Sequence, residues 1–97
     1  MTLAIHLGAE QDIADAMDFY NEHAGPHVAQ GFFNEFNRVA KLLLERPKLG
    51  AAITKGRRVF AMRVFPYSIV YRELPDGIRI IVVRHQRRKP GFGGSRR

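Results

Sequence analysis

The hydrophobic period changes from helical to strand-like in the middle of this 97-residue chain, and that change restricts the fold more than any other feature. In the first half, apolar residues recur at spacings of three and four, which is the period of one face of an α-helix. From residue 57 onward, segments rich in Val, Ile, Tyr and Phe follow one another, as strands do. Helices first and strands later indicate an α+β fold.

The amino-terminal residues predict a strand followed by a helix. Residues 3–7 alternate apolar and polar or small side chains, the period of a strand with one buried face. Gly8 breaks that pattern, and Ile13, Met17 and Tyr20 then lie on one helical face. The other faces of this helix carry acidic side chains, namely Asp12, Asp15, Asp18 and Glu22.

A second, more apolar helix is expected over residues 26–46. Gly25 can end the first helix and Pro26 can open the second, while Pro47 ends it. Its apolar stripe steps by three and four and should form the main core: Val28, Phe32, Phe36, Val39 and Leu43. Two helices joined by a tight turn form an antiparallel hairpin.

Three strands are expected in the second half, over residues 59–64, 67–74 and 78–84. Pro75-Asp76-Gly77 is turn chemistry, so the last two strands should form a hairpin. The unbroken apolar run 80–83 predicts a central strand that is covered on both faces. The element order is therefore β-α-α-β-β-β, a helical hairpin packed on a mostly antiparallel four-stranded sheet.

The length and composition predict a single domain over residues 1–90, followed by a flexible basic tail over 91–97. The chain has no cysteine, which excludes disulfides and thiolate metal sites. It shows no secretion signal and no apolar run long enough to span a bilayer. We therefore expect a cytoplasmic protein that does not enter the membrane.

Charge is divided unequally between the two halves of the chain. Residues 1–50 hold four basic and seven acidic residues, a net charge of −3. Residues 51–97 hold twelve basic and two acidic residues, a net charge of +10. Such a positive half attracts a polyanion, whether nucleic acid, an acidic protein segment or anionic lipid, or it serves only as a solubilising surface.

The histidines give no metal site. His23 and His27 are four apart, but Gly25-Pro26 lies between them and prevents a shared helical face. With no thiolate and no third ligand nearby, we expect neither a metal nor another cofactor. His85 follows the central strand and opens a basic run, so it is either an acid or base near a phosphate or a structural cap of the strand.

Two further motifs are interpreted as structural. Asp12 and Asp15 lie three apart on the polar face of the first helix, where an exposed position gives no cleft to shift their pKa values. They are therefore expected to be solvated. The glycines of segment 91–94 lack the flanking strand, helix and Lys-Ser/Thr pair of a phosphate loop.

Arginines recur along the predicted strands. If the helical hairpin covers one face of the sheet, several of them should emerge on the other face or at its rims, where they would bind carboxylates or phosphates. These residues are Arg57, Arg58, Arg63, Arg72, Arg79 and Arg84. Direct sequence-specific DNA binding is not expected, because the second helix is too apolar to enter a groove and Phe92 is the only aromatic in the basic tail.

Several stretches of the chain resemble the ParE/RelE superfamily of type II toxins. They are residues 12–20, the helix exit 43–50, the strand pair 63–72 and the terminal run 83–90, which together cover essentially the whole chain. The resemblance implies a toxin that arrests bacterial growth and forms a hetero-oligomer with a cognate, ParD-like antitoxin. In this superfamily a flexible, often acidic antitoxin segment folds over the toxin, and that segment would suit the basic half of the chain.

The superfamily has two branches, and the chain departs from one of them. RelE-like members cut ribosome-bound mRNA with basic side chains and a proton-handling group. Their basic strand positions fall here at Ala61, Arg63 and Ser68, the arginine after the last strand at Arg87, and the tail tyrosine near Phe92. Two cationic positions and the phenol are thus lost. ParE-like members, which inhibit DNA gyrase, need no such set.

The leading hypothesis is therefore a gyrase-directed toxin without catalytic residues. The expected target-binding residues are Arg87, Arg88, Lys89, Phe92, Arg96 and Arg97, and the expected antitoxin-binding residues are Arg58, Arg63, Arg72, Arg79 and Arg84. The alternative is a metal-independent mRNA endonuclease that uses His85, Arg63 and Arg87. A third possibility is a degenerate member that only binds its antitoxin.

Overall fold

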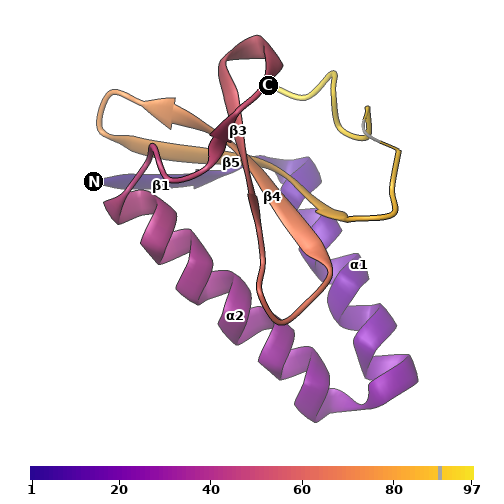
Figure 1. Cartoon of the computed structure of the whole chain (residues 1–97). Coiled ribbons are helices and arrows are strands. Elements are labelled where there is room, and N and C mark those ends of the chain that lie inside the picture. Colours follow the sequence, from indigo (N-terminus) through magenta and orange to yellow (C-terminus); the bar gives the residue numbers. More distant parts are fainter. Residues whose placement is uncertain (90) are drawn as a thin grey trace.

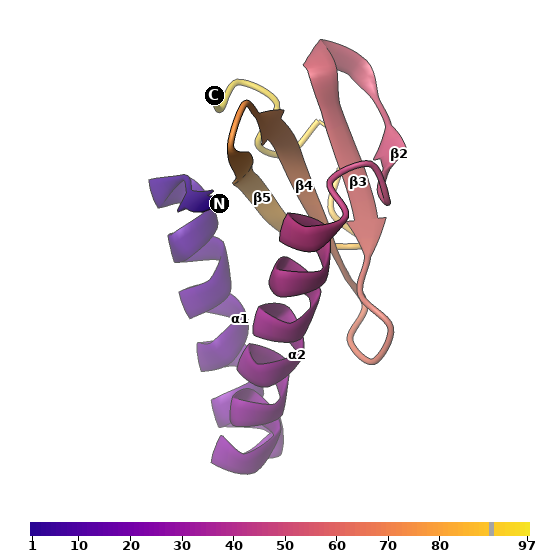
Figure 2. The same ribbon diagram turned by 90° about the vertical axis from the view of Figure 1, so that its left-hand side faces the viewer.

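Two helices pack on one face of a five-stranded sheet in the computed structural model, which describes residues 1–89 and 91–97 (Figures 1 and 2). Helix α1 (Leu7–Ala24) and helix α2 (Pro26–Glu45) lie side by side as the predicted hairpin, with Gly25 between them at φ 93°. Pro90, the last residue of the terminal run, lies outside the described residues. In the described part of the chain, no helix has the length and apolarity needed to cross a membrane.

The sheet has the order β1-β5-β4-β3-β2. Strand β1 (Thr2–Ile5) runs parallel to β5 (Gly77–His85), and β4 (Tyr67–Leu74), β3 (Arg57–Ala61) and β2 (Ala51–Ala52) add on in antiparallel pairs. The α+β class and the mostly antiparallel sheet are confirmed. The fifth strand, β2, was not predicted, because a two-residue Ala-Ala segment carries no alternating pattern.

Two predicted strand boundaries are wrong. The first strand ends at Ile5, and Leu7 instead begins α1, where it is exposed. His6 caps this helix, because its Nδ1 accepts a hydrogen bond from the Gly8 N–H at 2.9 Å. The strand expected over 59–64 spans 57–61, so Arg63 lies in the loop that leads to β4.

The main core lies between the helices and the sheet. The α2 stripe supplies buried Phe32, Phe36, Val39 and Leu43, as its spacing predicted, and they join buried sheet residues such as Ile80. A smaller apolar cluster of Val70, Ile81 and Val82 lies on the opposite face of the sheet, which we call the far face. Phe92 and Val59 pack against it, so the central strand β5 is covered on both faces, as predicted.

A β-bulge in β5 places apolar residues on both faces of the sheet. Val70 pairs with Val82 whereas Tyr71 pairs with Ile80, so Ile81 is the extra residue. Ile80 accordingly joins the helix-side core, and Ile81 and Val82 join the far-face cluster. The bulge thus puts two consecutive residues on the far face, and all four residues 80–83 are buried because both faces of this strand are covered.

The buried Tyr71 hydroxyl fixes the exit of α2 to the sheet. It donates to the Pro47 carbonyl at 2.7 Å and accepts from the Gly50 N–H at 2.8 Å. A Cβ atom on Gly50 would lie 2.7 Å from the Tyr71 hydroxyl oxygen, so only glycine fits there. Burial raises the pKa of Tyr71 further above neutral pH, at which the hydroxyl is already protonated and able to donate.

We expect Tyr71→Phe to lower the free energy of unfolding by about 1–3 kcal/mol, because it leaves the buried Gly50 N–H without its acceptor. Urea unfolding followed by circular dichroism measures the loss. Tyr67→Phe is the matched control, since the Tyr67 hydroxyl makes no hydrogen bond to residues 1–89 or 91–97. Equal losses in the two variants would contradict the role assigned to the Tyr71 hydroxyl.

Candidate functional site

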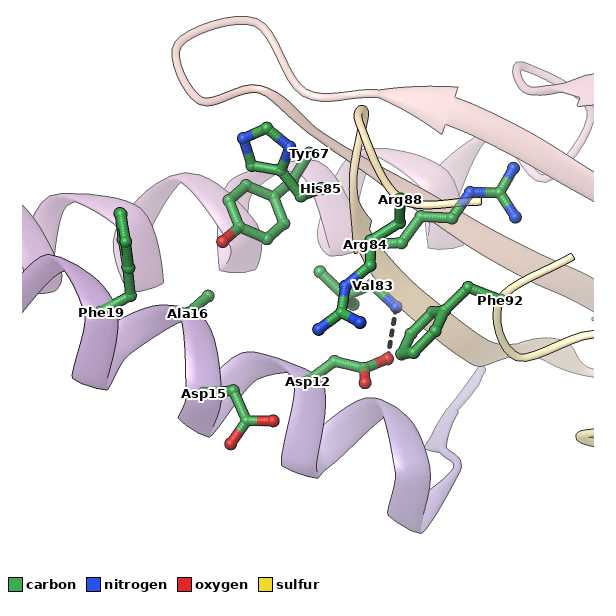
Figure 3. Close-up of a pocket in the computed structure, with 10 residues that line it drawn as sticks. All are labelled: Asp12, Asp15, Ala16, Phe19, Tyr67, Val83, Arg84, His85, Arg88 and Phe92. Atoms are coloured by element: carbon green, nitrogen blue, oxygen red, sulfur yellow. Dashed lines mark hydrogen bonds between the residues drawn. The ribbon is translucent and has the colours of Figure 1, made fainter. Parts of the chain in front are cut away.

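A groove of about 370 Å³ lies between α1, the end of β5 and the carboxy-terminal segment (Figure 3). We call it the α1–β5 groove. Helix α1 and the sheet form its walls, and the residues after β5 close one side. It is lined by Asp12, Asp15, Ala16, Phe19, Tyr67, Val83, Arg84, His85, Arg88 and Phe92.

Aromatic side chains form much of the groove wall. Phe19 is 51% exposed, although its ring contacts those of Tyr20 and His23. Tyr67 is buried in the sheet, and burial raises the pKa of its hydroxyl. An exposed aromatic beside a groove is a typical anchor for a protein partner.

His85 is held as a cap at the end of β5. Its ring lies edge-on to Tyr67, with the ring centroids 5.2 Å apart. Its Nδ1 accepts a hydrogen bond from the Arg87 N–H at 3.1 Å, so the neutral ring carries its proton on Nε2. This geometry is that of a structural cap, and the role of His85 stays a prediction.

The Asp12–Arg96 ion pair covers an open edge of β5. Strand β1 ends at Ile5, so Ile81 and Val83 have no neighbouring strand on that side. The Asp12 Oδ2 accepts from the Val83 N–H at 3.0 Å, and the Arg96 Nη1 donates to the Ile81 carbonyl at 3.3 Å. The two side chains also pair with each other, at 2.6 Å and 3.2 Å, and so supply the bonds of a missing strand.

The expectation that Asp12 is solvated was therefore wrong, whereas Asp15 is exposed as expected. Asp12 lies among small buried residues of α1, Ala9 and Ala16, which let the helix approach β5 closely. The buried face of this helix was predicted from its large apolar residues alone. The alanines at positions 9 and 16 were the signal that a second face of α1 is buried.

The carboxy-terminal segment packs on the far face of the sheet. The Phe92 ring covers the far-face cluster, with the guanidinium carbons of Arg88 and Arg96 at 4.6 Å and 5.1 Å from its centroid. Gly93 has φ 76°, and a Cβ atom there would lie 2.5 Å from the Val82 side chain. Phe92 and Arg96, expected to meet the target, thus hold this segment in place.

The other expected target-binding residues are exposed. Arg87, Arg88 and Lys89 follow β5 in a turn, and Arg97 ends the chain (Figure 1). Arg88 both lines the α1–β5 groove and stacks on Phe92. The turn therefore presents three neighbouring positive charges beside the groove.

The five arginines expected to bind the antitoxin do not form one patch. Arg58 lies on the helix side of the sheet, where it contacts Glu73 at 3.4 Å and the Gly50 carbonyl at 2.9 Å. Arg63 is exposed in the β3–β4 loop. The remaining three come from the strands of the hairpin and are Arg72, Arg79 and Arg84, of which Arg84 lines the groove.

Two of the nuclease positions that the resemblance places on the strands are neutral, namely Ala61 and Ser68. Ala61 and Ser68 are direct partners across β3 and β4, so two adjacent cationic positions are missing together. Of the three residues of the alternative nuclease, only His85 lines the groove, and Arg63 and Arg87 do not. Within residues 1–89 and 91–97, no three His, Cys, Asp or Glu side chains are placed to hold a metal ion.

Comparison with known proteins assigns the chain to a family. Residues 3–90 match the family described as ParE toxin of type II toxin-antitoxin system, parDE. Toxin ParE2 of Mycobacterium tuberculosis, from strains CDC 1551 and H37Rv, is 32% identical over 89 residues, 91% of this chain and 84% of that toxin. A solved structure titled "Chromosomal ParDE TA system from P. aeruginosa" has the same fold, with a TM-score of 0.78 and 23% identity over 88% of this chain and 95% of that one.

We expect Asp12→Asn to lower the free energy of unfolding by about 1–3 kcal/mol, because it leaves the partly buried Arg96 guanidinium without a counter-charge. The carboxy-terminal segment should also become more sensitive to trypsin. Asp15→Asn, one turn away and exposed, is the matched control and should change neither property. Wild-type stability in Asp12→Asn would show that the ion pair does not hold the segment.

Proposed function

The chain belongs to the ParE toxin family of type II toxin–antitoxin systems, and we propose that it arrests bacterial growth by inhibiting DNA gyrase. A cognate, ParD-like antitoxin would hold it inactive in a hetero-oligomer. Gyrase and its DNA lie in the cytoplasm, which is where we place the complex. Inhibition requires binding to the enzyme and its DNA and no chemistry by the toxin itself.

The observation that carries this proposal is the neutral pair Ala61 and Ser68 across β3 and β4. An RNA-cutting relative needs cations at these positions to stabilise charge on the scissile phosphate, and losing one preorganised donor costs about a hundredfold or more in rate. Phe92 has no hydroxyl and its ring packs on the far-face cluster. The loss of both cations and the phenol favours inhibition by binding.

We assign the contact with the gyrase–DNA complex to the turn after β5. Arg87, Arg88 and Lys89 are exposed there, next to one another, and no acidic side chain forms an ion pair with them in the described part of the chain. Their field would attract DNA or an acidic protein surface. Arg96 and Phe92 would contribute indirectly, by holding the carboxy-terminal segment against the sheet.

We assign the α1–β5 groove to the antitoxin. Phe19, Tyr67 and Phe92 give it an apolar surface, while Arg84 and Arg88 add positive charge. An antitoxin segment that carries both apolar and acidic residues would match this lining, with helix-in-groove burial as the driving force. Such a segment would also cover the turn after β5 and block its contact with the gyrase–DNA complex, which would explain how the antitoxin neutralises the toxin.

We expect the purified toxin to inhibit DNA supercoiling by gyrase and its antitoxin to relieve the inhibition. Arg87→Ala/Lys89→Ala should weaken inhibition about tenfold or more, because it removes two charged contacts. Lys41→Ala/Arg46→Ala, which removes the same two residue types from α2 and its C-cap, is the charge-matched control. An equal loss of inhibition in both double variants would show that inhibition depends on net charge and not on the turn after β5. No inhibition by the folded wild-type toxin would overturn the proposal.

We expect His85→Ala to keep growth arrest and supercoiling inhibition, because the His85 ring only packs on Tyr67 and caps β5. Circular dichroism confirms that the variant is folded. The nuclease alternative is tested by measuring cleavage of ribosome-bound mRNA by the wild-type toxin and by His85→Ala. Cleavage that falls a hundredfold or more in folded His85→Ala would replace gyrase inhibition with the nuclease alternative.

A further inference from the structure

Three arginines lie side by side on the far face of the sheet. The strand registers pair Arg57 of β3 with Arg72 of β4, and Arg72 with Arg79 of β5. Since neighbouring strands lie about 4.8 Å apart, this arginine row is about 10 Å wide. Like charges directly opposite each other destabilise a sheet, so the row has a cost that the fold alone does not explain.

The row is held by neutral acceptors only. Arg57 donates through Nη1 to the Gly93 carbonyl at 3.3 Å and through Nη2 to the Arg96 carbonyl. Arg72 donates through Nη2 to the Lys55 carbonyl at 3.1 Å. Across the described residues, the row makes no ion pair with any carboxylate.

Lys55 adds a fourth charge to the row. Its backbone takes the left-handed conformation, with φ 63°, which is uncommon for a residue other than glycine. Its Nζ donates to the Gly94 carbonyl at 2.7 Å. Two cations of this group therefore rest on carbonyls of the carboxy-terminal segment.

Two guanidinium donors of the row are buried and have no acceptor in the part of the chain that the structure describes. They are the Nε atoms of Arg57 and Arg72, and Arg57 is only 6% exposed. Burial, and then the charge of Arg72, lower the pKa of Arg57. Both arginines line a cleft of about 500 Å³ whose other lining residues are Lys55 and residues 94–97, with no Asp or Glu among them.

We propose that the arginine row, with Lys55, binds phosphate groups. A guanidinium fork matches phosphate oxygens, and a phosphate accepts donors from several directions, whereas a carboxylate has two oxygens in one plane. An anion in the cleft would both accept from the two Nε donors and compensate the clustered charge.

The arginine row is distinct from the nuclease positions of the superfamily. Arg57–Arg72 and Ala61–Ser68 are the two outermost partner pairs of the β3–β4 ladder, so the row lies at its opposite end. Phosphate binding there does not depend on gyrase being the target. The phosphate comes either from a nucleic-acid backbone or from a small phosphate compound.

Arginine Nε–H resonances in two-dimensional NMR of the full chain test the proposal directly. Inorganic phosphate or a single-stranded oligothymidylate should shift the Arg57 and Arg72 Nε–H signals, because both donors gain an acceptor. A response to the oligonucleotide at far lower concentration than to phosphate identifies the backbone source, and the converse identifies a small phosphate. No shift with either probe, or a stronger response to polyglutamate, overturns the proposal.

Two variants measure the contribution of the row to binding. Arg79 makes no hydrogen bond or ion pair with the described residues, so Arg79→Gln should fold normally. It should lower the salt-dependence slope of oligothymidylate binding by about 0.7, and Arg72→Gln/Arg79→Gln by about 1.4. The charge-matched control, Lys41→Gln/Arg46→Gln on α2 and its C-cap, should retain more affinity than the double row variant. Equal loss in the two double variants would show non-specific attraction and overturn the proposal.

Discussion

The Asp12–Arg96 ion pair is the interaction on which the arrangement of this molecule depends, since it joins α1, the edge of β5 and the carboxy-terminal segment. The sheet is incomplete beside Val83, because β1 is only four residues long. By filling that edge, the pair sets one wall of the α1–β5 groove. It also places Phe92 over the far-face cluster and brings the carbonyls of Gly93 and Arg96 to Arg57.

The two end pairs of the β3–β4 ladder differ in charge: one pair is neutral and the other consists of two arginines. At one end of β3 and β4, Ala61 faces Ser68, where an RNA-cutting relative carries cations. At the other end, Arg57 pairs with Arg72, and the buried Nε–H donors of both side chains have no acceptor among the described residues. The positive charge of the second half of the chain is thus concentrated in the arginine row at one end of the β3–β4 ladder, and in Arg84 and the turn after β5 at the other end, where Arg84 pairs with Ser68.

Sequence reasoning predicted the elements better than their contacts. The spacing of the α2 stripe and the apolar run of β5 predicted the helix-side core and a central strand covered on both faces. Strand register was beyond reach, because it is set by the Ile81 bulge and by turn geometry, and a slip of one residue exchanges the faces. For that reason the sequence identified the arginines of the strands but did not show which face of the sheet each one occupies. The burial of Asp12 was missed because its partner lies 84 residues away.

The parallel pairing of β1 with β5 has a consequence for the order in which the chain matures during translation. Thr2 pairs with Gly77, so the first strand made must wait for the last one before it has a neighbour. A growing chain closes such long-range pairs only after paying the entropy of the intervening loop. The helical hairpin therefore leaves the ribosome with its apolar stripe uncovered, and the sheet that covers it is complete only after β5 has been made.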